Sequence, residues 1–199
     1  MSDTRKTSDG KGFISDFDVY LFKQGAHRKM YEKLGSHAIS VDGKEGVRFA
    51  VWAPNAEYVS VIGNWNGWNR GSHPLSARWD ASGIWEGFVP GIGRGEVYKY
   101  HISSNVKGYK VDKADPYAFR HEAPPKTASI VWEPGYEWGD AEWMKTRRDP
   151  NSLSSPLSIY EVHLGSWMRV PEEGGRRLGY REIAPRLADY VKSTGFTHV

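Results

Sequence analysis

The residues best suited to chemistry in this sequence are the aromatic and amide side chains of a short turn that spans Gly63 to Asn69 and reads GNWNGWN. An indole offers a flat apolar surface with an N–H group at its edge, which matches the C–H face and the hydroxyls of a sugar ring. Trp65 and Trp68 are therefore candidate binding platforms, and the amide of Asn69 is a candidate polar contact. The alternative is that one indole, Trp65 more readily than Trp68, packs into a core while Gly and Asn form the turn.

Two further candidate contacts lie later in the chain. Lys99 belongs to an alternating run in which Tyr98 and Tyr100 share the opposite face, so its ammonium group could donate to the hydroxyls of the same ligand. A solvated strand lysine is the alternative. Tyr109 follows a Lys-Gly turn and is a third candidate platform. Four other tryptophans are assigned mainly to the core: Trp52, Trp79, Trp85 and Trp132.

Other kinds of chemistry have less support. Glu161 and His163 share one face of a predicted strand, which would allow a catalytic or metal-binding pair, but a role as polar support of the strand is favoured. The 7 His have no H-x-H or H-x-x-x-H spacing and Cys is absent, so no metal site is predicted. The Gly-rich residues 91–95 lack the lysine and serine of a phosphate-binding loop. No cofactor is expected.

Charge and hydropathy limit which binding partners and which cellular compartment are expected for this chain. Lys and Arg total 27 against 24 Asp and Glu, for a net charge of +3. The basic pairs are isolated, so a nucleic-acid partner is not expected. No apolar run approaches the roughly 20 residues of a membrane-spanning helix, and the first residues lack the apolar segment of a secretory signal. With no Cys, this pattern fits the reducing cytoplasm.

The central part of the chain shows the two-residue period of β-strands. Five short alternating runs, separated by Gly, Pro and Asn clusters, span residues 47–51, 58–62, 84–89, 97–102 and 128–132. This spacing predicts an antiparallel sandwich or small barrel over residues 46–133. The GNWNGWN turn follows the second run, and Lys99 lies in the fourth.

The flanking segments have different compositions. Residues 1–15 are polar and are predicted to be a disordered tail. Residues 16–45 form a lead-in with short helical stretches, the first of which begins at a capping box of Ser15 and Asp18. Residues 134–157 are rich in Pro and Ser and are predicted to be a connector.

Residues 158–199 show a strand–helix–strand pattern. The strand is predicted over residues 159–164 and the helix over 180–194, where Ile183, Leu187 and Val191 form one apolar stripe. Gly195 suits the position after the helix, and a second strand begins directly behind it. This order is typical of a parallel sheet. Because the sequence stops inside that strand, we expect it to be the N-terminal fragment of a longer protein.

Several of these segments resemble a known enzyme family. The GNWNGWN turn, the run VYKY at 97–100 and DPYA at 115–118 are similar to the glucan-associated β-sandwich module that precedes the barrel in branching and debranching enzymes. The segments IYEVHLGSW at 159–167, GYRE at 179–182 and GFTHV at 195–199 resemble the start of the barrel in bacterial 1,4-α-glucan branching enzymes. The resemblance covers about residues 16–199.

The resemblance implies both a fold and an activity. The fold is mainly β: an immunoglobulin-like β-sandwich followed by the first β-α-β piece of an incomplete (β/α)8 barrel of the α-amylase superfamily. The activity is that of a glycogen-synthesising transferase, which cleaves an α-1,4 linkage and rejoins the chain through an α-1,6 linkage by retaining double displacement. The implied partners are glycogen, amylose and maltooligosaccharides, with an intramolecular contact to the missing barrel. The two carboxylates lie on later strands, so no catalytic residue is assigned and the fragment alone is expected to be inactive.

Three alternatives remain at the level of the sequence. They are a non-catalytic glucan-binding or regulatory module, a debranching hydrolase of the same architecture, and an oligonucleotide-binding β-barrel that stacks bases on aromatic rings. Residues 158–199 argue against the first, because a pure module has no use for them. The small net charge argues against the third. The second would be distinguished by the missing barrel strands.

Overall fold

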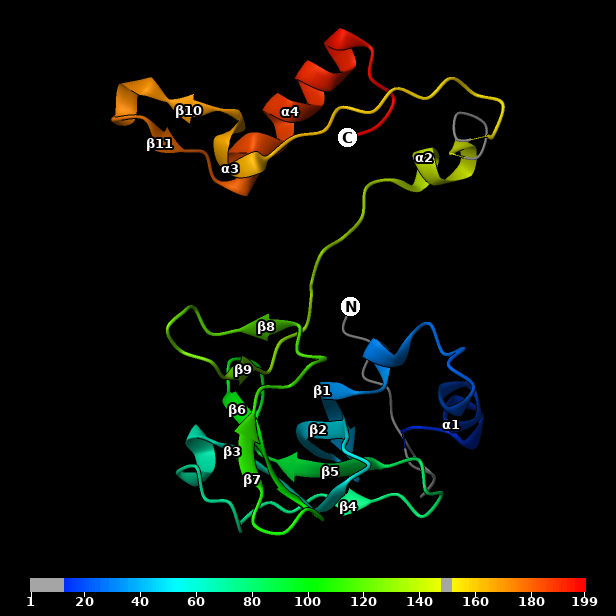
Figure 1. The fold of residues 1–199 in the computed structure, drawn as a ribbon, viewed down its shortest axis with the longest axis vertical. Coiled ribbons are helices and arrows are strands. Elements are labelled where there is room, and N and C mark those ends of the chain that lie inside the picture. Colours follow the sequence, from blue (N-terminus) through cyan, green and yellow to red (C-terminus); the bar gives the residue numbers. More distant parts are fainter. Residues whose placement is uncertain (1–12, 148–151) are drawn as a thin grey trace. The chain divides into compact units, whose positions relative to one another are not determined.

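The structure of this 199-residue chain is a computed structural model that describes residues 13–147 and 152–199. The chain divides into two compact units, residues 1–136 and 137–199 (Figure 1). Most of the predicted tail lies outside the described residues. The elements of the first unit are, in order, α1 (Asp16–Lys23), η1 (Met30–Glu32), β1 (Gly35–Val41), β2 (Lys44–Trp52), β3 (Ala56–Gly63), η2 (Asn64–Asn66), β4 (Ser76–Ala77), β5 (Ile84–Pro90), β6 (Val97–Ser104), β7 (Lys110–Lys113), β8 (Arg120–His121) and β9 (Ser129–Ile130).

Two antiparallel sheets make up the first unit. One sheet has the order β1-β2-β5-β4. In the other, β3 pairs with one edge of β6, and β9 and β7 share the opposite edge, with β8 beyond β9. The predicted sandwich is therefore confirmed as two β-sheets, with more strands than the alternation indicated.

The inward-facing side chains of the alternating central strands fill the space between the sheets. Val47, Phe49 and Val51 of β2 face Val59 and Val61 of β3, together with Tyr98 and Tyr100 of β6, in one core cluster. The Phe49 ring meets both tyrosine rings edge-on, at centroid distances of 5.0 and 6.5 Å. Burying a large aromatic side chain is among the most favourable single contributions to a small core.

A second, smaller cluster lies on the other face of β2. Ala50 and Ile84 pack there against Ile14, Val19, Met30 and Leu34 of the lead-in. The predicted capping box starts α1 as expected: the Ser15 hydroxyl oxygen accepts from the Asp18 N–H at 3.1 Å, and the Asp18 carboxylate accepts from the Ser15 N–H at 2.8 Å. The first part of the lead-in is thus packed onto the sandwich, whereas its residues 35–41 form strand β1 of the sheet and not a helical stretch.

One carboxyl group is buried between the sheets. The Tyr98 and Tyr100 hydroxyls donate to Asp115 at 2.6 and 3.1 Å, and the Asp115 N–H donates to the Ser129 hydroxyl at 2.8 Å. Asp115 is 1% exposed, and its burial raises its pKa above the usual value. The carboxyl group ties the segment after β7 to β6 and β9.

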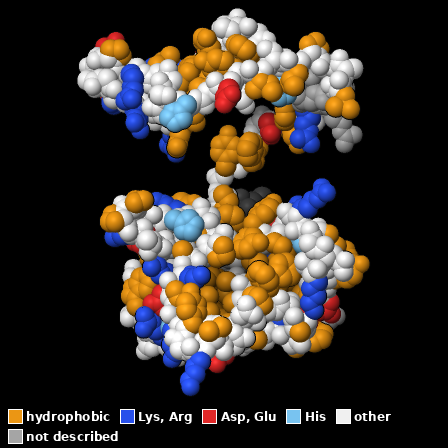
Figure 2. All heavy atoms as spheres, in the orientation of Figure 1, with side chains coloured by type: hydrophobic (Ala, Val, Ile, Leu, Met, Phe, Trp, Pro, Cys, Tyr) orange, Lys and Arg blue, Asp and Glu red, His pale blue; other side chains and the backbone are white. Residues whose placement is uncertain are grey.

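The second unit has little buried apolar surface. Its elements are α2 (Ala141–Thr146), α3 (Leu164–Trp167), β10 (Arg169–Val170), η3 (Pro171–Glu173), β11 (Arg176–Arg177) and α4 (Tyr180–Thr194). Helix α4 matches the predicted helix, and Gly195 ends it in the left-handed region at φ 79°. Ile183 and Val191 of the predicted stripe are buried. Hydrophobic side chains remain at the surface of this unit (Figure 2).

Of the strand predicted over residues 159–164, the structure forms only a bridge at Ile159. Ile159 forms a single parallel bridge with His198, the Tyr160 N–H donates to the His198 carbonyl at 2.9 Å, and α3 begins at Leu164. A strand needs a partner along its length, and among the described residues this segment pairs only with residues near His198.

Candidate functional site

The GNWNGWN turn is compact and is stabilised by hydrogen bonds from its own side chains. The Asn66 side-chain oxygen Oδ1 accepts from the Gly63 N–H, and the side-chain nitrogen Nδ2 donates to the Val61 carbonyl, both at 3.0 Å. A Cβ atom at Gly63 would collide with the Trp65 ring, so glycine is needed for that ring to fold back onto the strand. The side chain of Asn66 is therefore engaged in stabilising the turn. Trp68 and Asn69 remain as the candidate ligand contacts of this segment.

Trp65 fits the core alternative. Its ring stacks on Phe49 with centroids 6.1 Å apart and planes at 20°, and it packs against the main core cluster. Its indole nitrogen is buried and has no hydrogen-bond partner among the described residues. The surroundings of Trp65 therefore match the alternative in which this ring packs into the core. Its role as a glucan-binding platform stays a prediction.

Trp68 is the more available indole. It is 38% exposed, and its Nε1–H donates to the Asn64 side-chain oxygen at 3.1 Å, which sets the orientation of the ring. Its backbone lies in the left-handed region at φ 60°, directly after Gly67 at φ 61°. A bulky residue pays a conformational penalty there, on the order of 1–2 kcal/mol. An oriented, exposed aromatic ring at a strained position is a candidate for function.

Asn69 and Lys99 contribute polar groups at the same end of the β3–β6 pair. The Asn69 side-chain oxygen accepts from the Gly71 N–H at 2.9 Å, and Lys99 Nζ donates to the Thr127 hydroxyl at 2.8 Å. Lys99 lies opposite Ile62 in the strand register, and Gly63, where the turn begins, lies opposite Tyr98. The predicted orientation of the strand is confirmed, since Tyr98 and Tyr100 are both fully buried on the inner face.

Arg70 fixes the loop that follows the turn. Its guanidinium donates to both Asp112 oxygens at 3.2 and 2.7 Å, and its carbonyl accepts from the Tyr58 and Ser60 hydroxyls at 2.9 and 2.6 Å. The Arg70 hydrogen bond lowers the pKa of Asp112 below its usual value. Arg70 is exposed and Asp112 is partly exposed, so the contribution of the pair to stability is small. Its effect is to hold the Trp68 turn in register with β6 and β7.

Tyr109 does not lie with the other candidates. It is 52% exposed and precedes β7, where its carbonyl accepts from the Ser104 N–H at 3.0 Å. Ser104 lies five positions after Lys99 along β6, or about 17 Å of extended chain. The structure therefore places Tyr109 at the opposite end of β6 from Trp68, Asn69 and Lys99.

Two of the tryptophans assigned to the core are exposed, so that assignment is wrong for them. Trp52 is 54% and Trp79 is 83% exposed. Trp52 alternates with the inward-facing Val51 and therefore points outward, while Trp79 lies in the loop after β4. Trp85 does pack against the core, with its Nε1–H donating to the Ala53 carbonyl at 3.1 Å. The fourth, Trp132, is half-buried between the guanidinium groups of Arg94 and Arg120.

The acidic and histidine side chains of the described residues do not gather into a metal-binding cluster. No cluster of three or more His, Asp or Glu side chains suited to a metal ion occurs among residues 13–147 and 152–199. Glu161 is exposed, and His163 Nδ1 lies 2.8 Å from the Ser166 hydroxyl. In the described part of the chain, no helix is both long and apolar enough to cross a bilayer.

Comparison with known proteins relates the chain to carbohydrate-active proteins. Residues 33–118 match the family model of carbohydrate-binding module 48, the isoamylase N-terminal domain. The chain is 57% identical over 186 residues to the 1,4-alpha-glucan branching enzyme GlgB of Aquifex aeolicus, and 54% identical over 185 residues to that of Albidiferax ferrireducens. These matches cover 94% and 93% of this chain but 29% of each relative. The described sandwich is therefore similar to carbohydrate-binding module 48 over residues 33–118, in a chain that is similar over nearly its whole length to about three tenths of a 1,4-alpha-glucan branching enzyme.

Proposed function

We propose that this chain is the N-terminal part of a glycogen branching enzyme, a transferase that forms α-1,6 branches from α-1,4-glucan chains. The observation that carries the proposal is the 57% identity, over 94% of the chain, to a protein named as such an enzyme. The reaction is a retaining double displacement on two carboxylates that the rest of the parent protein supplies. Its proposed compartment is the reducing cytoplasm, which is consistent with a chain that has no Cys.

Residues 158–199 are proposed as the first strand, helix and second strand of the catalytic barrel. The parallel bridge between Ile159 and His198 and the intervening helix α4 support this assignment. The rings of Tyr160, Tyr190 and Phe196 lie together beside the bridge, with Tyr160 5.1 to 5.4 Å from the other two. In the complete barrel this unit would gain neighbouring strands and an intramolecular contact with the remaining strands and helices.

The sandwich contributes a non-catalytic glucan contact at Trp68, Asn69 and Lys99. One glucose ring stacks on the Trp68 indole while the Asn69 amide and the Lys99 ammonium bond its hydroxyls. Each solvent-competed hydrogen bond contributes about 0.5–1.5 kcal/mol, so millimolar to high-micromolar affinity is expected. Such a contact holds glycogen, amylose or a maltooligosaccharide near the barrel.

The binding proposal is tested by titrating maltoheptaose into the 199-residue chain and into three variants. Trp68→Ala is expected to weaken binding about tenfold, and Lys99→Ala about threefold. Trp79→Ala is the matched control, because it removes an equally large and more exposed indole elsewhere in the same unit. Binding is measured by calorimetry, with near-ultraviolet circular dichroism to check the fold.

Two results would count against the proposal. A folded Trp68→Ala protein that binds as tightly as the parent would make the turn a structural brace for the barrel. The enzymatic part is tested separately, by assaying the complete gene product for new α-1,6 linkages in amylose, and their absence would overturn it.

A further inference from the structure

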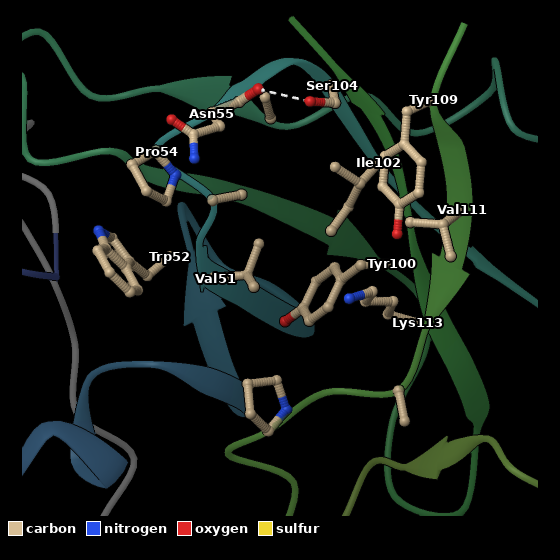
Figure 3. Close-up of a pocket in the computed structure, with 14 residues that line it drawn as sticks. Val51, Trp52, Pro54, Asn55, Tyr100, Ile102, Ser104, Tyr109, Val111 and Lys113 are labelled. Carbon is tan, nitrogen blue, oxygen red and sulfur yellow. Dashed lines mark hydrogen bonds between the residues drawn. The ribbon is translucent and has the colours of Figure 1, made fainter. Parts of the chain in front are cut away.

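A pocket of about 330 Å³ opens at the edge of the sandwich, at the end of β6 away from Lys99 (Figure 3). Its floor is formed by Val51, Tyr100, Ile102 and Val111, from β2, β6 and β7. The connection over residues 53–56, together with Ala114 and Pro116, completes its border. This volume lies at the lower end of the range of about 300–1,000 Å³ for small-molecule sites.

Two half-exposed aromatic rings stand on opposite sides of the floor. In Figure 3, Trp52 lies on one side and Tyr109 on the other, with Val51 and Tyr100 between them. The Trp52 ring is held by the bond from its Nε1–H to the Ser82 carbonyl at 3.0 Å and by an edge contact with Phe22 at 5.9 Å. Its exposure is therefore a fixed feature of the surface, and its ring is ready for stacking without further ordering.

Three polar side chains at this pocket have no hydrogen bond to other described residues: Asn55, Tyr109 and Lys113. The Asn55 backbone is held, because its carbonyl accepts from the Asn105 N–H at 2.8 Å and the Ser104 hydroxyl at 3.2 Å. The amide, the phenol and the ammonium thus keep their donors and acceptors available for a ligand.

The lining selects for a neutral, hydroxylated and partly apolar ligand. No carboxylate lines the pocket, so a cation has no counter-charge there, and a single lysine does not make a phosphate site. A pyranose ring has the required chemistry, with C–H faces for the two aromatic rings and hydroxyls for the amide, phenol and ammonium groups.

We propose that this pocket is a second glucan-binding site, which takes one or two glucose units of an α-1,4-linked chain. The inference rests on the proposed glucan-binding function and extends it to a separate place on the module. With Trp68 at one end of β6 and Tyr109 at the other, the module would hold a polymer at two points. Two weak contacts on one chain raise the overall affinity for glycogen above that for a short oligosaccharide.

The test is a residue-resolved titration of the ¹⁵N-labelled 199-residue chain with maltoheptaose, monitored by NMR. The Trp52 indole N–H and the Val111 amide report on the pocket, and the Trp68 indole N–H reports on the other site. The pocket signals are expected to shift and saturate in the parent. Tyr109→Ala is expected to weaken the pocket binding about tenfold and to leave the Trp68 titration unchanged.

Two further variants keep the test independent of folding. Tyr109→Phe retains the ring and is expected to lose about threefold in affinity, the part carried by the hydroxyl. Tyr20→Ala removes an equally exposed tyrosine from α1 and is expected to change neither titration.

The proposal is overturned if the Trp52 and Val111 signals stay still while Trp68 saturates, or if a folded Tyr109→Ala protein shows undiminished shifts at the pocket. Shifts at the pocket without a response from Trp68 would support this proposal and contradict the Trp68 site. A chain in which neither site responds contradicts both.

Discussion

The two units of this chain differ in how completely each buries its apolar side chains. The first contains two clusters in which Phe49, Tyr98, Tyr100, Leu34 and Ile84 are essentially inaccessible to solvent. In the described part of the second unit the buried hydrophobic residues are Leu178, Ile183 and Val191. Other hydrophobic side chains of that unit lie at its surface, among them Leu157, Ile159 and Tyr180 with exposures of 65%, 60% and 79%.

This difference separates a region that is stable by its own packing from one whose order depends on local interactions. The sandwich unit joins residues far apart in sequence through strand pairing. The second unit is held by the capped helix α4, a two-stranded β10–β11 hairpin and a few aromatic contacts. A short hairpin and a single helix are each marginal in water without a packed core.

Amide hydrogen exchange should show the largest contrast between the units. Amides of β2, β3 and β6 are expected to exchange only through global unfolding, which costs on the order of 5–15 kcal/mol in a domain of this kind. Amides of residues 157–199 should exchange through local opening, many orders of magnitude faster. Similar protection in both units, measured by mass spectrometry, would mean that the second unit has a stable partner of its own.

Deleting one side chain from each core tests the same contrast by stability. Phe49→Ala is expected to destabilise the sandwich by about 3–5 kcal/mol, because it opens a cavity against Tyr98, Tyr100 and Trp65. Ile183→Ala in α4 serves as the matched change in the other unit and should leave the urea midpoint of the sandwich where it was. A shared loss of stability in both variants, followed by circular dichroism, would contradict independent folding.

Two carboxyl groups give the units opposite responses to pH. Burial raises the pKa of Asp115, so between about pH 4 and its folded pKa the folded sandwich binds more protons than the unfolded chain. Stability from this group therefore falls as pH rises. The hydrogen bond from Arg176 lowers the pKa of Glu182 to about 2, so its contribution to the start of α4 is present above about pH 4.5 and is lost as pH falls toward 2.

Replacement of each group identifies its share of the response. Asp115→Asn should remove the decline of the urea midpoint above pH 4, and Glu182→Gln should remove the acid-induced increase in exchange of the α4 amides. Unchanged pH profiles in the variants would assign the effect to other groups. Both changes are expected to be smaller than the cavity effect, because each shifts only one protonation equilibrium.

Local signals made part of the fold predictable. The prediction for helix α4 matches both of its ends, because the apolar stripe with Ile183 and Val191 and the terminating Gly195 are local features of one short segment. Strand β1 was missed, although Asp42 and Gly43 stand in the left-handed region that a tight hairpin requires, and an Asp-Gly pair is a strong hairpin signal. Strands β4 and β8 have two residues each and depend on partners elsewhere in the chain.

The candidate site was predictable only where strand alternation decided it. Alternation placed Tyr98 and Tyr100 inside, and it also indicated that Trp52 faces away from Val51, a signal that the core assignment overlooked. The separation of Tyr109 from Lys99 depends on the strand register that pairs Ser103 with Lys110, and register is a property of two strands together.

Because the backbone of Trp68 is left-handed, the residues that would stabilise this position most differ from those that could bind a sugar ring. Glycine adopts this conformation freely and asparagine tolerates it, so either should raise the melting temperature of the module while removing the ring. A saturation library at position 68, sorted once for abundance in cells and once for retention on glycogen, is therefore expected to enrich Gly and Asn in the first sort and aromatic residues in the second. If both sorts enriched the same residues, the strain at this position would have no functional counterpart.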